Sequence, residues 1–262
     1  MTVGPDSGVR QPAPLREAVA LVTHANSSDV SDVSRRHVTS VNVLTWLRSL
    51  ELMQSLLAWA EDLARQLLED ALPRRWAHVQ GVAARARSLA PASADIELLE
   101  AAAWLHDIGY LPELAQTGLH ALDGARYLRD IQHAPQMLCR LVAHHSCAVV
   151  EAEERDLADV LRREFEPPPQ PLADALTFCD MTTSPDGEPV NVDRRLAEIL
   201  HRYGSEHLVS RSIRRAAPMI LRAVDRVMAS PSDSLSWGML RAWTGTSTPA
   251  ADGDLGVWVD GR

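Results

Sequence analysis

One stretch of the chain ends an apolar run on two adjacent polar side chains: Ala101-Ala102-Ala103-Trp104-Leu105-His106-Asp107-Ile108-Gly109-Tyr110. The run is typical of the end of a buried helix, which Gly109 and the nearby Pro112 would terminate. An imidazole nitrogen and a carboxylate oxygen at consecutive positions can bind the same divalent ion. The second carboxylate oxygen then remains for another ion. A single His-Asp pair is common on protein surfaces, so its meaning depends on the rest of the chain.

Histidines gather around this stretch. Six of the ten lie between residues 78 and 145, namely His78, His106, His120, His133, His144 and His145. His133 lies just before Pro135, where a loop or cap is expected. The others, together with Asp180, fall on or at the ends of apolar helical faces, which makes them candidates for a shared site.

Composition limits the classes of function. The chain has 262 residues, 46 % of them hydrophobic, which suits one large globular domain or two small ones. Its formal net charge of −9 argues against a general nucleic-acid or anionic-membrane binder. Three widely spaced cysteines fit reduced thiols rather than a disulfide framework. With no signal-peptide pattern and no apolar run long enough to span a bilayer, we expect a soluble cytoplasmic protein.

Helical spacing of apolar residues dominates the middle of the chain. It predicts helices over 52–68, 73–89, 95–105, 120–128, 136–145, 151–163, 172–180, 196–203 and 208–227, with Pro218 as a kink or boundary in the last. Gly124, one turn past His120, would allow a neighbouring helix or ligand to approach closely. No strand alternation appears, so the predicted fold class is all-α. We expect an irregular N-terminal arm over 1–42, a helical domain over 43–229 and an irregular tail over 230–262.

The candidate residues are best explained together. Any one of them has a simple structural interpretation, a hydrogen-bonded core histidine or a capping aspartate. As a set, several half-buried imidazoles and two carboxylates would each need a partner in an aliphatic core, whereas a metal ion satisfies them all.

The ordered set of residues resembles the HD-domain superfamily of metal-dependent phosphohydrolases, whose fold is a helical bundle. The resemblance runs from about Leu56 to Val227 and follows the order H…HD…H…HH…D of the members that hold two metals. It is carried by His78 in Arg75-Trp76-Ala77-His78, by His106-Asp107-Ile108-Gly109, by His120-xxx-Gly124-Ala125, by His144-His145 and by Asp180 in Phe178-Cys179-Asp180-Met181.

The resemblance implies a ligand set and a cofactor. His78, His106, Asp107 and Asp180 would hold a first metal. Asp107 would bridge to a second metal held by His120 and by one of the His144/His145 pair. We favour His145, because it continues the apolar face before it and is followed by Ser146, as in similar members. Asp107 and His106 would be central to catalysis, and the cofactor would be one or two divalent ions, with Mn, Fe, Mg, Zn or Ni all possible.

Two departures from the family pattern matter. Many family hydrolases have lysine after His-Asp-x-Gly, where Tyr110 stands here. The glycine-tyrosine-proline motif of the cyclic-di-nucleotide phosphodiesterases is absent after His145, which argues against that branch. Arg75, Arg126, Arg129 and Arg140 are candidates for phosphate contact, although solvated surface charge is the simpler interpretation of each.

Three functions follow from the resemblance. The leading hypothesis is hydrolysis of a phosphoester, a nucleotide or another small phosphorylated metabolite, through a metal-activated hydroxide. The alternative is a mixed-valence di-iron oxygenase, because a minority of six-ligand members use iron to activate oxygen. The third is a non-catalytic module that acts through partners.

Overall fold

The computed structural model describes residues 56–89 and 94–229. The predictions for the arm at 1–42 and the tail at 230–262 lie outside the described residues, as does the start of the predicted domain at 43–55. The first described helix covers residues 56–68. The following helices are α3 (Pro73–Ser88), α4 (Ala94–Leu105), η1 (Ile108–Tyr110), α5 (His120–Asp130), α6 (Gln136–His144), η2 (His145–Cys147), α7 (Ala148–Glu154), α8 (Ala158–Glu164), α9 (Gln170–Met181), α10 (Val192–Tyr203) and α11 (Leu208–Ala229).

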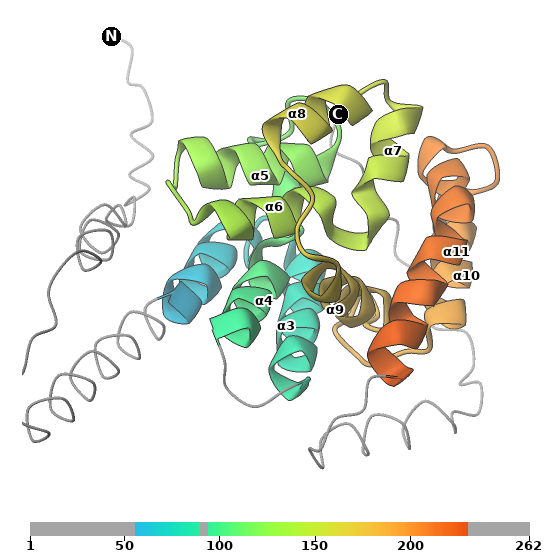
Figure 1. The fold of residues 1–262 in the computed structure, drawn as a ribbon, viewed down its shortest axis with the longest axis horizontal. Coiled ribbons are helices and arrows are strands. Elements are labelled where there is room, and N and C mark those ends of the chain that lie inside the picture. Colours follow the sequence, from blue (N-terminus) through green and yellow to red (C-terminus); the bar gives the residue numbers. More distant parts are fainter. Residues whose placement is uncertain (1–55, 90–93, 230–262) are drawn as a thin grey trace, which may run out of the picture.

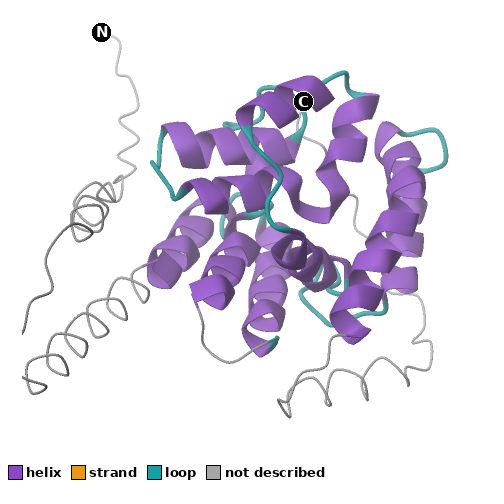
Figure 2. Cartoon of the chain, in the orientation of Figure 1, coloured by secondary structure: helices purple, strands orange, loops and turns teal. Residues whose placement is uncertain are grey.

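The all-α class is confirmed. Figure 2 shows helices joined by short loops, and the described part of the chain contains no strand beyond one isolated bridge between Thr183 and Pro189. Among these residues, no helix is both long and apolar enough to cross a membrane.

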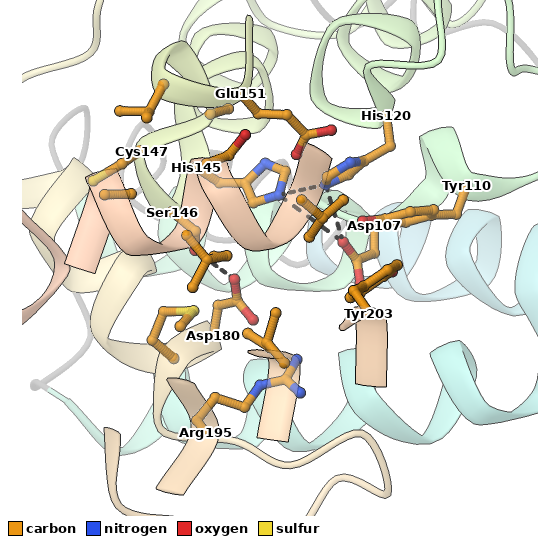
Figure 3. A pocket seen from close by; sticks show the side chains of 18 of the residues that line it. Asp107, Tyr110, His120, His145, Ser146, Cys147, Glu151, Asp180, Arg195 and Tyr203 are labelled. Carbon is orange, nitrogen blue, oxygen red and sulfur yellow. Dashed lines mark hydrogen bonds and ion pairs between the residues drawn. The ribbon is translucent and has the colours of Figure 1, made fainter. Parts of the chain in front are cut away.

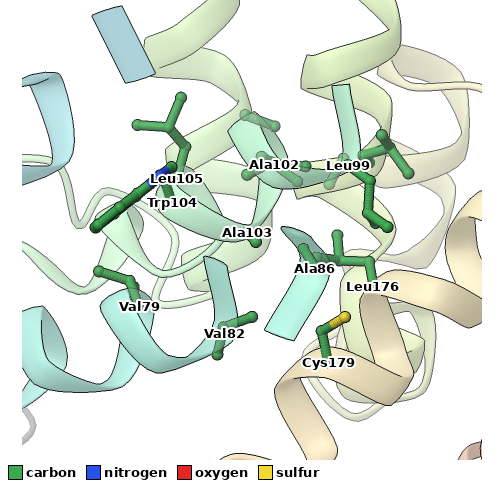
Figure 4. Packing of buried hydrophobic residues seen from close by; sticks show 14 of the residues in the cluster. Val79, Val82, Ala86, Leu99, Ala102, Ala103, Trp104, Leu105, Leu176 and Cys179 are labelled. Carbon is green, nitrogen blue, oxygen red and sulfur yellow. The ribbon is translucent and has the colours of Figure 1, made fainter. Parts of the chain in front are cut away.

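Helix α4 lies at the centre of the bundle. It packs against α3, α6 and α9, while α10 and α11 lie together at one side of the molecule, next to α7 and α9 (Figure 1). Small residues make this position possible, because Ala102 and Ala103 are fully buried and let neighbouring helices approach closely. Figure 4 shows buried side chains of α4, such as Leu99 and Ala103, in one cluster with Val82 of α3 and Leu176 of α9. The apolar stretch that ends in His106 and Asp107 is therefore the core helix of the fold.

The turn after α4 is pressed against the start of α5. A Cβ atom added at Gly109 would lie 2.0 Å from the carbonyl oxygen of His120, so only glycine fits there. The facing glycine, Gly124, would place a Cβ 3.1 Å from the backbone nitrogen of Gly109. The close approach predicted at Gly124 is thus present, and it fixes His120 beside the His106-Asp107 turn.

One local prediction was wrong, and one of the two alternatives at Pro218 is excluded. The charged segment expected as one helix forms α7 and α8, separated at Asp156, which adopts a left-handed conformation with φ 58°. Aspartate tolerates this conformation better than most residues. Pro218 is not a boundary, because α11 continues through it. Buried side chains on both sides, such as Ala216 and Ile220, hold the helix together despite one lost hydrogen bond.

Candidate metal centre

The structure brings six of the predicted residues together as two groups of three. One group contains His78 of α3, His106 from the turn after α4 and Asp180 of α9. The other contains Asp107, His120 at the start of α5 and His145 after α6. Within each group the ligand atoms lie within 4.8 Å of one another. Figure 3 shows the second group and Asp180 facing one pocket. Residues 102 positions apart in the chain, such as His78 and Asp180, thereby become neighbours.

Backbone carbonyls fix the orientation of three histidines. The Nδ1 atom of His78 lies 2.9 Å from the carbonyl oxygen of Ser184. The corresponding Nδ1 distances are 2.8 Å from His106 to Ala103 and 2.7 Å from His145 to Val142. A carbonyl oxygen only accepts hydrogen bonds, so each Nδ1 must carry the proton and donate it. In the neutral imidazoles, each Nε2 therefore directs a lone pair toward the site, the arrangement expected of a metal-binding histidine.

The Nε2 atoms of the site histidines lie close to other polar atoms of the site. The Nε2 of His78 lies 3.0 Å from Oδ1 of Asp180, and the Nε2 atoms of His120 and His145 are 3.1 Å apart. The Nε2 of His106 is buried without a hydrogen-bond partner among the described residues. Buried polar atoms normally have a partner. A cation at the first group would supply one for His106, and a cation at the second would lie where the Nε2 atoms of His120 and His145 converge.

The distances and the donor atoms both fit a divalent transition metal. Ligand atoms about 2.1 Å from one ion lie about 3.0 Å apart at right angles and about 3.4 Å apart at tetrahedral angles. Oδ1 of Asp107 lies 3.6 Å from Nε2 of His120 and 3.9 Å from Nε2 of His145, close to this range. A set of four imidazoles and two carboxylates suits Fe, Zn, Ni or Mn better than Mg, which prefers oxygen ligands. The residues present therefore fit the metal that the family resemblance implies.

Asp107 lies between the two groups. Its Oδ1 faces the histidines of the second group, and its Oδ2 lies 3.9 Å from Nε2 of His78 in the first. Arg75 donates a hydrogen bond of 2.6 Å to Oδ2. Burial acts to raise the pKa of Asp107, but the charge of Arg75 and the neighbouring histidines outweigh it and hold the pKa well below its ordinary value. The carboxylate is therefore ionised and lies close to histidines of both groups.

Tyr110 stacks between Arg75 and His120. The guanidinium carbon of Arg75 lies 3.3 Å from the centre of the Tyr110 ring, and the ring centres of Tyr110 and His120 are 3.9 Å apart. Burial raises the pKa of Tyr110 well above its ordinary value, so its phenol is neutral. The position that is lysine in many family hydrolases thus carries no charge here. The stack holds the imidazole of His120, and Arg75 supplies the positive charge.

Two further histidine properties bear on the site. Burial lowers the pKa of His120 and of His145, so both are neutral near pH 7 and ready to bind a metal. His144, the other candidate ligand, belongs to neither group. Its Nε2 lies 2.8 Å from the carbonyl oxygen of Phe165, on another part of the bundle.

Ser146 has a role at the site that its sequence context did not reveal. Its hydroxyl donates a hydrogen bond to Oδ2 of Asp180, which orients the carboxylate toward His78. Ser146 and Cys147 both have left-handed backbones, with φ 46° and 61°, and this double turn brings the hydroxyl to the pocket. No sequence signal marks such a turn, because neither residue is glycine or asparagine.

A cavity of about 90 Å³ opens beside Asp107, His120, His145 and Asp180. Its walls come from α7, α9, α10 and α11, and they include the apolar residues Val150, Ile199 and Ile213. Arg195 of α10 also lines it and was not singled out from the sequence. It shares one helical face of α10 with Ile199, Arg202 and Tyr203, but this spacing alone does not mark it as a site residue.

Of the four arginines considered for phosphate contact, only Arg75 lines this pocket. Arg126 and Arg129 form ion pairs with Glu164. Arg140 donates to the carbonyl oxygens of Glu166 and Pro167. These three belong to the surface interactions that the simpler interpretation foresaw.

Comparison with known proteins agrees with the geometry. No curated protein matches the chain, and no solved structure matches it. Residues 75–182 match the sequence profile of the HD domain, a segment that begins at Arg75 and ends just after Asp180. All six residues of the two groups lie inside it. This superfamily is of the metal-dependent phosphohydrolase type, although its members are not all enzymes. Residues 75–182 therefore form an HD domain and belong to the HD-domain superfamily.

Proposed function

We propose that the protein is a metal-dependent phosphohydrolase that acts on a small phosphoester, with His78, His106, Asp107, His120, His145 and Asp180 as the metal ligands. One observation carries the proposal. Three imidazoles tethered to backbone carbonyls direct their Nε2 atoms toward Asp107 and Asp180, two carboxylates that line one pocket. Cations among these groups would supply the partner that the buried Nε2 of His106 lacks.

The residues around the ligands suit an anionic substrate. Bound divalent ions would supply Lewis-acid stabilisation of phosphate charge and lower the pKa of a bound water. Asp107 and Asp180 balance only part of that positive charge, and Arg75 offsets one of these carboxylates. The pocket would therefore attract a phosphate group. Its small volume favours a small phosphorylated metabolite over a polymer.

The roles of the remaining residues follow from their contacts. Arg75 keeps Asp107 ionised and oriented, and Tyr110 holds the ring of His120 in place. Ser146 orients Asp180. The apolar wall at Val150 and Ile213 limits water around the substrate.

The test uses the full chain, purified and analysed for metal. Under nitrogen with added Mn²⁺, the wild type should hydrolyse members of a phosphoester panel. Asp107→Ala should abolish that activity, because it removes a ligand placed between both groups. A wild type that binds metal but hydrolyses no phosphoester would contradict the proposal.

A di-iron oxygenase is the second candidate, because the imidazole-rich ligand set suits iron equally well. An oxygenase would show no activity under nitrogen. It would consume oxygen in a substrate-dependent way once iron and air are restored. A non-catalytic module, the third candidate, would be inactive in both assays. Its partner binding would survive Asp107→Ala.

A further inference from the structure

One wall of the pocket lies outside the segment that matches the HD domain. Helix α10 begins ten residues after that segment ends and presents Arg195, Ile199, Arg202 and Tyr203 to the cavity. Positions separated by four, seven and eight residues lie on one face of a helix. This face therefore adds residues to the pocket that the family match does not assign.

Arg195 is the buried cation of this face. Only 6 % of its surface is exposed, and its guanidinium lies on the pocket side, near Asp180 (Figure 3). Its Nη1 donates a hydrogen bond of 2.6 Å to Glu198. Its Nε is buried and has no hydrogen-bond partner among the described residues. A buried N–H group of a charged side chain is costly to leave without a partner, so the position calls for a ligand.

Glu198 holds this guanidinium in a fixed orientation. It accepts the hydrogen bond from Arg195 through one oxygen and one of 2.8 Å from Arg202 through the other. Only the Nη1 atom of Arg195 donates to this carboxylate. The edge formed by Nε and Nη2 is the one with which arginine binds two phosphate oxygens in parallel. Glu198 thus leaves the Nε–Nη2 edge of Arg195 unoccupied.

We propose that Arg195 binds a phosphoryl oxygen of the substrate and selects phosphomonoesters over phosphodiesters. The inference rests on the phosphohydrolase function proposed above. A monoester has three non-bridging oxygens. Two of them would face the two ligand groups, and the third remains for Arg195. A diester has only two, and its second ester group would meet the guanidinium instead.

The first experiment measures binding of inorganic phosphate to the metal-loaded full chain by calorimetry. Arg195→Gln should weaken the affinity about 10- to 100-fold, the effect of one charge-assisted hydrogen-bond pair. Arg194→Gln is the matched control, because Arg194 is the exposed neighbour on the same helix. It should change the affinity less than about twofold. Metal content and thermal midpoint are measured for each variant to show that it is folded and loaded. Glu198 keeps Arg202 as a partner in Arg195→Gln, so the substitution does not leave this carboxylate unpaired.

The second experiment compares p-nitrophenyl phosphate with bis(p-nitrophenyl) phosphate. Arg195→Gln should lower kcat/KM for the monoester about 100-fold and for the diester less than about tenfold, so that the preference collapses. Arg195→Lys retains the charge without the fork and should recover part of the monoester rate. It also serves if the glutamine variant does not fold.

The outcomes separate the two proposals. Phosphate binding that depends on Arg195, without hydrolysis of any phosphoester, would sink the proposed function and leave the anion site in place. Hydrolysis with equal losses for both esters, or phosphate affinity that is unchanged in Arg195→Gln, would overturn the role of Arg195.

Discussion

Replacing Gly109 by alanine should separate the two groups of the candidate metal centre. The added Cβ would lie 2.0 Å from the carbonyl oxygen of His120 and 2.7 Å from the backbone nitrogen of Gly124. Real Cβ atoms essentially never approach other atoms below 3.0 Å, so the start of α5 must retreat by about 1 Å. Both obstructing atoms belong to the backbone of α5, so no side-chain rotation relieves the clash.

The displacement acts on one group of ligands and spares the other. His120 is the first residue of α5, and its Nε2 lies 3.6 Å from Oδ1 of Asp107. Metal–ligand distances tolerate about 0.2 Å, so a shift of about 1 Å removes His120 from coordination. His78, on α3, is not touched. We expect Gly109→Ala to bind about one ion fewer per chain, to lose at least about 100-fold in rate and to lose about 1–3 kcal/mol of stability.

Metal content per chain, turnover and denaturant unfolding check this prediction together. Gly124→Ala is the graded comparison, because its Cβ would be 3.1 Å from the nitrogen of Gly109 and needs a shift of only a few tenths of an ångström. Gly204→Ala is the control for backbone strain, since Gly204 has φ 75° but no atom within 4 Å of the added Cβ. Wild-type metal content in Gly109→Ala, with stability within about 0.5 kcal/mol of wild type, would refute the reasoning.

Three further outcomes are expected. Chelation should lower the thermal midpoint by several degrees, and adding the ion at 100 times its Kd should raise the free energy of unfolding by about 2.7 kcal/mol. Equal midpoints with and without metal would argue against a resident ion. Ser146→Ala should weaken metal binding about 10- to 100-fold in a competition assay, because Asp180 loses its hydroxyl donor, and unchanged affinity would contradict that role. The metal-free protein should be most stable above about pH 6.5 and should lose stability as the pH falls further. Burial depresses the folded-state pKa of His120 and His145, so the unfolded chain takes up protons that the native state resists; a flat pH profile of the melting temperature between 8 and 5 would exclude this.

Much of the fold was predictable because it depends on spacing. Apolar residues three and four apart identified most of the helices, and the order of histidines and aspartates along them identified the candidate site. Such patterns can be read from the sequence because metal binding requires particular residue types, here histidine and aspartate. His145 was favoured over His144 because it continues the apolar face before it and is followed by Ser146, and the structure turns His144 toward Phe165 instead.

The remaining features depend on tertiary contacts that spacing does not encode. Arg195, Glu198 and Arg202 have the separation of an ordinary surface ion-pair series on a helix, so nothing in the sequence distinguishes them from solvated charges. Arg195 differs from a surface arginine because it is buried where α10 packs against α11 beside the pocket. The role of Ser146 could not be read from the sequence either, because the position of its hydroxyl depends on two consecutive left-handed residues. The break at Asp156 also depends on a left-handed residue.

The location of α10 beyond the HD domain has a consequence for how this protein could acquire new substrates. All six candidate ligands lie within residues 75–182, whereas Arg195, Ile199 and Tyr203 lie on a helix that contributes none of them. Under the proposed function, mutations on this face would change which molecule is accepted while leaving all six candidate ligands in place. A library restricted to the pocket-facing positions of α10 would therefore vary substrate choice separately from the ligand set.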